Sequence, residues 1–363
     1  MKIGILYLGK KGAGPVYTLE MARNIYRYNR DICVFLSESV ENKADFEEEE
    51  FEKRYFKTYG NSLEFLFSLV SVYRIRRIVK AIDDYSPDIL YSSMTCLWDP
   101  MVFAGIKQTI VKVKTIHDVE MHLGRGITVY EKFVHNMQFK QANKFVILSR
   151  KYISQLESKG ISQDRICVIP HAGFTSYAKN ARISYNEDPV ILFFGRIVKY
   201  KGLGLLLEAM TEVLRVCPKL TLRIVGSGNL EPYKEQINML GKNVEVYNFF
   251  IEDSQVAQYV SDVDVVVLPY IHATQSGVIP LAYAFHKPVI ATDTGALSEQ
   301  VVDGRTGYIV SADPGAIASK ILEMCTRDGR EKAKMMGHYA NEFMKENLTW
   351  DSSARKFLEF MNN

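Results

Sequence analysis

The chain has 363 residues, a length that predicts two domains or one large one. Its hydrophobic fraction is 47% and its charged fraction 24%, which excludes disordered, collagen-like and coiled-coil classes. The longest apolar runs fall short of the roughly 18 uncharged residues of a membrane-spanning helix. The apolar run over residues 1–9 has no small-residue cleavage site, so it is predicted to be a buried strand rather than a signal peptide.

The net charge of +3 is distributed unevenly. Residues 1–185 carry 27 basic and 20 acidic side chains, whereas residues 186–363 carry 18 basic and 22 acidic ones. This asymmetry predicts that the N-terminal half faces an anionic partner such as a phospholipid surface, a lipid-linked phosphate or a nucleic acid; the alternative is an unevenly solvated surface. The five cysteines are scattered and no H-E-x-x-H pattern occurs, so we expect a reducing compartment and neither a disulfide scaffold nor a structural metal site.

Short apolar, β-branched runs alternate with helical patterns, which is typical of parallel sheets covered by helices on both faces. In the N-terminal half the expected strands are 3–8, 32–36, 89–91, 111–116, 145–148 and 166–169. In the C-terminal half they are 190–194, 220–225, 244–247, 263–268, 289–292 and 307–310. Expected helices include 17–28, 203–216 and 277–286, with an amphipathic helix over 350–361.

The pattern breaks over residues 172–189, where glycine, serine, asparagine, lysine and proline replace the apolar periodicity. We therefore expect one Rossmann-like domain over 1–175, a second over 185–345, and a C-terminal helix over 346–363 that packs back across the domains. In open α/β sheets, ligands bind at the carboxyl ends of the strands. Candidate site residues are therefore expected directly after the strands.

The most specific motif is FGRIVKYKGL at residues 194–203, between an expected strand and an expected helix. Gly195 leaves room for the close approach of a ligand. The guanidinium of Arg196 can form bidentate hydrogen bonds with phosphate oxygens, and Lys201 supplies a second positive charge. The motif predicts a site for a diphosphate leaving group, and a solvated basic loop is the alternative.

Two glycine-rich turns follow other strands. Gly226 and Gly228 come after the strand 220–225, and Gly12 and Gly14 lie in a basic loop after the first strand. Neither turn fits the G-x-G-x-x-G fingerprint, so a dinucleotide oxidoreductase is the least expected function. Both turns suit the close approach of an anion to a helix N-terminus; a plain glycine-rich turn is the alternative.

A polar loop containing Thr274, Gln275, Ser276 and Gly277 separates the strand 263–268 from the helix that follows. Its backbone N–H groups and the positive end of the helix dipole can bind an anion without charged side chains. Thr274 and Ser276 can also cap the helix, and the two roles are compatible.

Two segments of the N-terminal half carry further candidates. The run His117-Asp118-Val119-Glu120-Met121-His122 follows the strand 111–116, which favours acid–base or metal chemistry for its side chains over a buried structural histidine. The segment 63–80 is apolar and then basic. It is predicted either to pack on the first sheet with its basic residues outside or to lie on an anionic membrane surface.

At residues 195–202, 226–228 and 287–307 the chain resembles the retaining glycosyltransferases of family 4, also called group 1. The resemblance is good over 190–310 and looser in the N-terminal half. It implies the GT-B architecture, in which two Rossmann-like, doubly wound domains face each other across a cleft.

The resemblance also implies roles for individual residues. Arg196 and Lys201 match the pair that neutralises the diphosphate of a nucleotide sugar, and His117 matches a histidine that contacts the donor sugar or the acceptor. The glycines and one apolar residue match the positions that admit the phosphates and border the nucleoside; these are Gly12, Gly14, Gly195, Gly226, Gly228 and Ile251, the last at the main-chain contact to the base.

One departure from the family concerns two glutamates, one at the donor sugar and one at the ribose hydroxyls. Their positions are Ala273 and Leu281 here, and neither side chain accepts a hydrogen bond. The stretch 273–277 resembles a variant form in which polar side chains and main-chain N–H groups replace them.

We therefore expect a retaining, metal-independent glycosyltransferase of the hexosyltransferase type, without a cofactor. Its donor is expected to be a UDP-, GDP- or dTDP-sugar, its acceptor a glycan or lipid-linked saccharide, and its role polysaccharide biosynthesis. The cysteine pattern predicts a cytoplasmic protein, and the basic N-terminal half predicts a peripheral contact with the inner face of the cell membrane, without a nucleic-acid partner. The alternatives are a non-catalytic sugar-nucleotide-binding partner subunit and a GT-B sugar-nucleotide epimerase.

Overall fold

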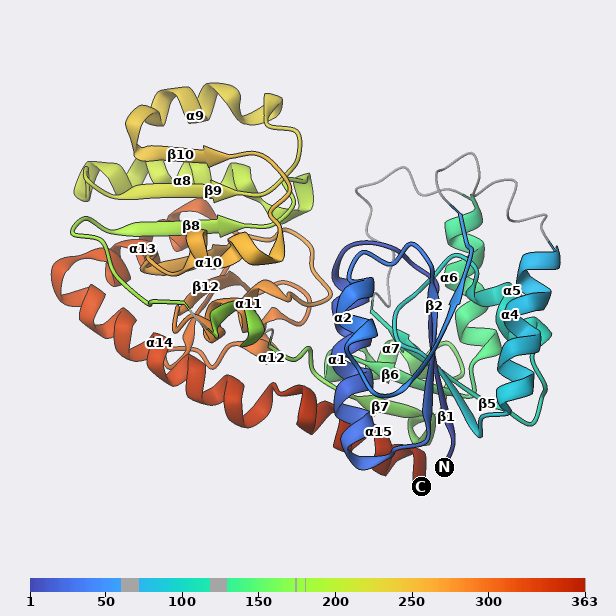
Figure 1. Cartoon of the computed structure of the whole chain (residues 1–363). Helices are drawn as coiled ribbons and strands as arrows, with labels where there is room; N and C mark the ends of the chain where they lie inside the picture. The colour runs from blue at the N-terminus through green and yellow to red at the C-terminus, as the bar shows by residue number, and fades with distance from the viewer. Residues whose placement is uncertain (60–71, 118–128, 174, 180, 363) are drawn as a thin grey trace. The chain divides into compact units, whose positions relative to one another are not determined.

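The computed structural model describes residues 1–59, 72–117, 129–173, 175–179 and 181–362. The chain forms two compact units (Figure 1). Unit 1 comprises Met1–Pro170 together with Trp350–Asn363, and unit 2 comprises His171–Thr349. Each unit is a parallel sheet with interleaved helices, which confirms the predicted fold class.

Within the described residues, the sheet of unit 1 has seven strands in the order β3-β2-β1-β4-β5-β6-β7. The strands are β1 (Ile3–Tyr7), β2 (Ile32–Ser37), β3 (Glu52–Phe56), β4 (Ile89–Ser92), β5 (Val111–Ile116), β6 (Lys144–Ile147) and β7 (Ile166–Val168). The helices are α1 (Ala13–Tyr28), α2 (Lys43–Glu47), α4 (Val72–Tyr85), α5 (Asp99–Gly105), α6 (Val129–Gln141), α7 (Ile153–Glu157) and α15 (Trp350–Asn362). The strand order reverses between β1 and β4, which is where sheets of this class bind ligands.

The edge strand β3 is missing from the expected elements. Its sequence is EKRYF, with Glu52 exposed and the other four residues half-buried. It pairs with β2 and lies at one end of the strand order. Edge strands commonly carry charged side chains that discourage further pairing, so β3 lacks the apolar run by which the other strands were predicted.

Unit 2 has, over its described part, a six-stranded sheet in the order β10-β9-β8-β11-β12-β13. The strands are β8 (Val190–Phe194), β9 (Thr221–Val225), β10 (Val244–Tyr247), β11 (Val265–Leu268), β12 (Val289–Thr292) and β13 (Gly307–Val310). The helices are α8 (Leu203–Val216), α9 (Lys234–Leu240), α10 (Val256–Val260), α11 (Val278–Ala284), α12 (Leu297–Gln300), α13 (Pro314–Cys325) and α14 (Arg327–Asn347). The strand order reverses between β8 and β11.

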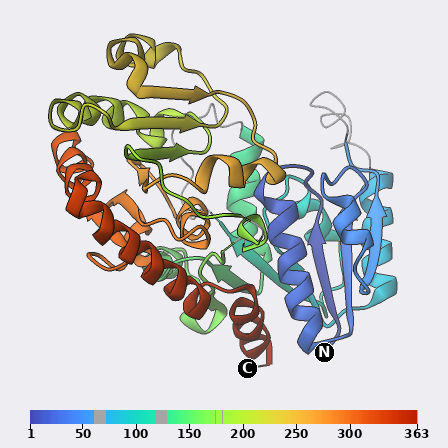
Figure 2. The same cartoon turned by 60° about the vertical axis from the view of Figure 1, so that its left-hand side comes forward.

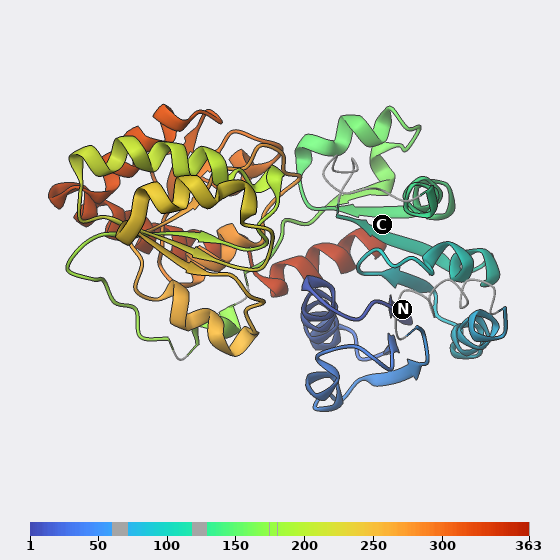
Figure 3. The ribbon, with the colours of Figure 1, turned by 90° about the horizontal axis from the view of Figure 1, so that it is seen from above.

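Both faces of the unit 2 sheet are buried under helices (Figures 1 and 3). Along β8, Ile191 and Phe193 pack into the core that includes α8 and α13. Val190 and Leu192 pack into the core that includes α10 and α11. Alternate side chains of a strand point to opposite faces, so a strand covered on both sides is a continuous apolar run. The long helix α14, traced in orange-red in Figure 2, contributes buried residues to both cores.

The C-terminal helix α15 belongs to unit 1 and packs along α1. The Trp350 ring meets the Tyr17 ring of α1 edge-on, with centroids 5.1 Å apart. The Phe357 ring lies 4.5 Å from the Tyr91 ring of β4. The buried face of α15 thus carries apolar residues of the predicted amphipathic pattern. Among the helices in the described ranges, none is long and apolar enough to cross a membrane.

Candidate active site

The predicted basic pair follows β8, at the point where the strand order of unit 2 reverses. After β8 the chain makes a 3₁₀ turn over Lys199–Lys201 before α8 begins. Arg196 is exposed, and its Nη2 donates a hydrogen bond to Tyr200 Oη at 3.2 Å. Lys201 is half-buried. Two cations therefore lie at the carboxyl ends of the strands, the position at which an anionic ligand is expected.

The turn that carries Lys201 lies against the loop that follows β11. Ile271 N donates to Tyr200 O at 2.8 Å. Gly202 has φ +70°, and a Cβ atom there would lie 1.7 Å from Pro269 O. Only glycine permits both this backbone conformation and this approach. The structure therefore brings together the basic motif and the polar loop, which the sequence predicts as separate candidates.

Buried groups hold Lys201 and the polar loop. Lys201 Nζ donates to Tyr270 Oη at 2.5 Å, and Tyr270 Oη lies 3.2 Å from Ser276 Oγ. Gln300 of α12 holds the main chain of Ser276 on both sides: Ser276 N donates to Gln300 Oε1 at 2.9 Å, and Gln300 Nε2 donates to Ser276 O at 3.0 Å. Sequence reasoning assigned no role to Tyr270 or Gln300. Tyr270 lies between the strand 263–268 and the predicted polar loop, whereas no sequence pattern links Gln300 to that loop.

The glycines after β9 allow the loop that follows β9 to pack closely against the loop that follows β8. Gly226 has φ +137°, and a Cβ atom there would lie 2.1 Å from Gly195 O. A Cβ atom on Gly228 would lie 2.2 Å from Ile197 O. The Asn248 side chain, after β10, receives a hydrogen bond from Gly228 N at 3.0 Å and donates one to Gly228 O at 3.1 Å. Three successive loops are thus joined at one edge of the sheet.

Ile251 follows β10 in the same group of loops. Its side chain is half-buried and packs against the core below α10 and α11. Because the side chain is used in packing, the main chain is what Ile251 can offer a ligand. That arrangement suits the main-chain contact to a base that the family resemblance implies.

The two positions at which the family has glutamates are packed into the core. Ala273 is 9% exposed and Leu281 is 5% exposed, and both belong to one apolar cluster. Thr274 and Ser276 are buried as well, and Ser276 Oγ accepts a hydrogen bond from Val278 N at 3.2 Å. Ser276 therefore pairs with the first N–H group of α11, but the N-cap residue is Gly277, so the predicted side-chain cap is not formed.

The N-terminal candidates lie in unit 1. Gly12 has φ +88° and directly precedes α1, and its N–H donates to Glu41 Oε1 at 2.8 Å. Gly14 lies within the first turn of α1 rather than in the loop. A Cβ atom on Gly14 would lie 2.3 Å from Tyr7 Oη, so the glycine makes room for the buried Tyr7 ring. Burial raises the pKa of the Tyr7 hydroxyl well above its usual range.

His117 is half-buried and directly follows β5. In the strand order, β5 is the neighbour of β4, so His117 and the α1 loop both follow strands near the reversal point of unit 1. The other polar residues predicted beside it, Asp118, Glu120 and His122, lie outside the described residues.

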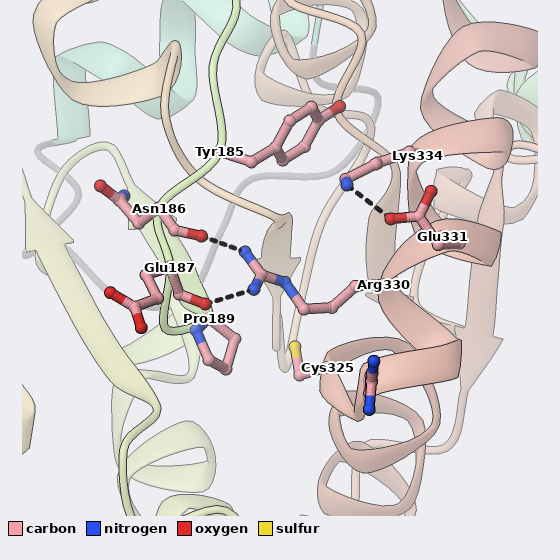
Figure 4. A pocket seen from close by; sticks show the side chains of 9 residues that line it. Tyr185, Asn186, Glu187, Pro189, Cys325, Arg330, Glu331 and Lys334 are labelled. Atoms are coloured by element: carbon pink, nitrogen blue, oxygen red, sulfur yellow. Dashed lines mark hydrogen bonds and ion pairs between the residues drawn. The ribbon is translucent and has the colours of Figure 1, made fainter.

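A cavity of about 470 Å³ lies at the opposite, amino-terminal end of β8 (Figure 4). Segment 185–189 forms one wall, and Cys325 with residues of α14 forms the other. Arg330 makes three hydrogen bonds there, from its guanidinium to Asp264 Oδ1 at 2.7 Å and to the carbonyl oxygens of Asn186 and Glu187 at 2.6 Å each. None of the predicted site residues lines this cavity, and its arginine fixes the segment that leads into β8.

Lys287, beside this segment, is fully buried. Its Nζ donates to Ser184 O at 3.1 Å and lies 4.0 Å from the Tyr185 ring centroid. Burial lowers the pKa of Lys287 from 10.5 to about 8, although the carboxylates of Asp264 and Asp262 partly oppose the shift. Below pH 8 the folded protein therefore holds a buried ammonium group that burial destabilises.

This burial predicts a pH dependence of stability. Between about pH 8 and 10.5 the unfolded chain keeps the proton on Lys287 that the folded chain has lost, so the free energy of unfolding rises with pH. The rise attributable to Lys287 is at most about 3 kcal/mol. Urea unfolding of the wild type and Lys287→Met between pH 7 and 10.5 measures it. The free energy of unfolding of the wild type, relative to that of the variant, should increase with pH. If the free energies of the two proteins change with pH in parallel, the assignment to Lys287 is contradicted.

Comparison with known proteins shows similarity to glycosyltransferases. Residues 188–327 match the family model for Glycosyl transferases group 1. An uncharacterized glycosyltransferase of Methanocaldococcus jannaschii is 26% identical over 267 residues, which cover 71% of this chain and 70% of that protein. A GDP-mannose-dependent alpha-(1-6)-phosphatidylinositol monomannoside mannosyltransferase of Mycolicibacterium smegmatis is 26% identical over 216 residues, which cover 56% of this chain and 54% of that protein. The chain therefore spans only about half the length of this second relative.

Among solved structures, Anabaena HepE in complex with UDP aligns with a TM-score of 0.77 at 18% identity, with all of both chains covered. The same protein has also been solved with UDP-glucose. At this identity the likeness concerns the fold alone. The loops after β8, β9 and β11 that hold the predicted motifs all lie within the residues matched by the family model. The C-terminal unit therefore resembles the group 1 glycosyltransferases over residues 188–327, and the chain has the GT-B fold.

Proposed function

We propose that the protein is a retaining glycosyltransferase that moves a sugar from a nucleotide-diphosphate sugar to a glycan or lipid-linked acceptor without a divalent metal. The nucleotide binds unit 2, where the loops after β8, β9 and β10 meet. Arg196 and Lys201 stabilise the negative charge that develops on the departing diphosphate, in place of a metal ion. The acceptor attacks from the face that the leaving group vacates, so the anomeric configuration is retained.

One observation carries this proposal: two cationic side chains at the switch point of the unit 2 sheet, on a loop packed against the glycine-rich turn after β9. Charge that is already in place when the diphosphate departs is the largest single contribution that an active site commonly makes. The matched family and the names of the relatives support the choice of a nucleotide sugar as donor.

The test begins with the nucleotide. UDP, GDP and dTDP are added in turn, and the nucleotide that binds should raise the melting temperature, because a ligand of the native state stabilises it. UDP-glucose and GDP-mannose are then tested for slow release of nucleotide by mass spectrometry, with and without EDTA. Release that survives EDTA supports the proposal, and the anomeric configuration of the transferred sugar is read by NMR. Inversion of configuration, or a strict need for a metal, would contradict the mechanism.

A second function is favoured by the burial of Ala273 and Leu281 in the core, which leaves no carboxylate at these positions. A non-catalytic, sugar-nucleotide-binding partner subunit would bind the same nucleotide and release none. The mass-spectrometric assay therefore separates the two functions.

The acceptor side belongs to unit 1 in this proposal, and α4 supports a lipid-linked acceptor at an anionic membrane. The helix packs through Ile75, Ile78 and Ile82, which are buried. Its first residues, Val72 and Tyr73, are 56% and 72% exposed. An apolar tip beside outward-facing basic residues suits a peripheral contact with the inner face of the membrane. Residues 63–71 of this predicted segment lie outside the described ranges.

The membrane contact is tested with vesicles of equal parts phosphatidylglycerol and phosphatidylcholine at low salt. Arg76, Arg77 and Lys80 are exposed on α4. Each basic residue near an anionic lipid surface contributes about 1 kcal/mol. Reversing all three to glutamate should therefore lower vesicle affinity by at least about 100-fold in a sedimentation assay.

The control makes the same change of charge on unit 2, at the exposed Lys219, Lys234 and Lys242. This variant should keep most of the binding. Equal losses in both variants would mean that net charge alone, and not α4, governs the contact.

A further inference from the structure

A chain of hydrogen bonds runs from the surface loop of unit 2 into its core. It begins at Lys201 Nζ, passes through Tyr270 Oη at 2.5 Å, and reaches Ser276 Oγ at 3.2 Å. Tyr270 and Ser276 are only 2% and 3% exposed. The half-buried ammonium group therefore touches a relay whose other members are shielded from water.

The contact with Tyr270 restrains Lys201 in two ways. Besides the hydrogen bond to Oη, the Lys201 Nζ atom lies 3.8 Å from the centroid of the Tyr270 ring, where a cation is attracted to the aromatic face. A free lysine side chain carries about 2 kcal/mol of rotamer entropy, which an unrestrained cation would lose on meeting its ligand. An ammonium has three N–H donors, and the tyrosine takes one of them. Two donors remain for an anion.

The far end of the relay is fixed as well. The Tyr270 hydroxyl, which accepts from the Lys201 ammonium, is also hydrogen-bonded to Ser276 Oγ, and either of these two oxygens can be the donor. Gln300 then grips the main-chain N–H and C=O of Ser276 with two hydrogen bonds. Hydrogen bonds through Tyr270 and Ser276 therefore connect Lys201 to Gln300 of helix α12 and fix its position.

We propose that Tyr270 is a positioning residue for Lys201: its hydroxyl holds the ammonium ready for the diphosphate that departs from the donor sugar. This inference rests on the proposed function and adds a residue to it. A cation that is already placed does not have to reorganise when charge develops, so it favours the transition state more than the bound donor. Tyr270 acts only through Lys201 and touches no reacting atom.

The test is Tyr270→Phe, which keeps the ring and removes the hydroxyl. With UDP-glucose or GDP-mannose as the probe, kcat for nucleotide release should fall at least about 10-fold, whereas KM should change by less than about 3-fold. In a Lys201→Ala background the same substitution should have no further effect, because its target is gone. A merely structural tyrosine would lower the rate in both backgrounds.

Tyr308→Phe is the matched control. Tyr308 Oη also accepts a hydrogen bond from a lysine, Lys332 Nζ at 2.6 Å, so the chemical change is the same. This variant should keep near-wild-type kcat. If Tyr270→Phe loses its fold in a melting experiment, Ser276→Ala replaces it, because that variant removes the hydrogen-bond partner of the Tyr270 hydroxyl and should also lower kcat more than KM.

The outcomes separate the inference from the proposed function. If calorimetry detects no binding of UDP, GDP or dTDP to the wild type, the proposed function fails and the inference fails with it. If the wild type binds and turns over a donor but Tyr270→Phe behaves like Tyr308→Phe, only the inference fails. The inference also fails if Tyr270→Phe lowers kcat by the same factor in the Lys201→Ala background as in the wild type.

Discussion

Arg196→Ala and Lys201→Ala are each expected to lower kcat for nucleotide release by about 100- to 1,000-fold, the loss commonly seen when one group that stabilises transition-state charge is removed. Arg196 reaches the site from the exposed loop after β8, and Lys201 reaches it from the turn held by Tyr270. In the proposed mechanism their charges act on the same diphosphate, so the double variant should lose less than the product of the single losses.

Lys199→Ala is the control for this pair. Lys199 lies in the same 3₁₀ turn and is exposed. Its removal changes the net charge of the loop equally and should leave kcat within a few-fold of the wild type. Near-normal rates for both Arg196→Ala and Lys201→Ala, measured under single-turnover conditions, would show that the diphosphate is stabilised elsewhere.

Gly202→Ala is expected to lower the free energy of unfolding of unit 2 by more than about 3 kcal/mol. A residue other than glycine in the left-handed region costs about 1 to 2 kcal/mol. The added Cβ would also lie 1.7 Å from Pro269 O, so the loop after β11 must move away from the turn that carries Lys201. Urea unfolding measures the loss, and nucleotide affinity should fall with it.

Gly304→Ala separates the cost of the left-handed backbone from the cost of the steric contact. Gly304 has φ +72°, close to the φ of Gly202, but an added Cβ meets no atom within 4 Å. This variant should lose only the conformational part, about 1 to 2 kcal/mol. Equal destabilisation by the two substitutions would mean that the contact with Pro269 adjusts without cost.

The sequence predicted most of both sheets because their strands are covered on two faces. The strand β8 is a run of five apolar residues, and its alternate side chains enter the two cores of unit 2. The candidate loops could be located for the same reason, since ligands of such sheets bind after the strands. The strand β3 could not be predicted, because an edge strand with charged side chains has no apolar run.

The interactions that complete the candidate site depend on residues far apart in the chain. Lys201 and Tyr270 are separated by 69 positions, and Gln300 reaches Ser276 over 24 positions. Neither contact follows from local spacing, because each is created when neighbouring strands bring their loops to one edge. The sequence indicated that Ala273 and Leu281 lack carboxylates, but only the fold places both side chains in the apolar core.

The helix α15 has a consequence for how the chain is made. Unit 2 is continuous in sequence, whereas unit 1 combines the first 170 residues with the C-terminal helix α15, which carries Trp350 and Phe357. Domains usually fold as they leave the ribosome, the N-terminal one first. Here the unit that is synthesised first is completed last, because the helix that covers Tyr17 and Tyr91 is translated only after the whole of unit 2.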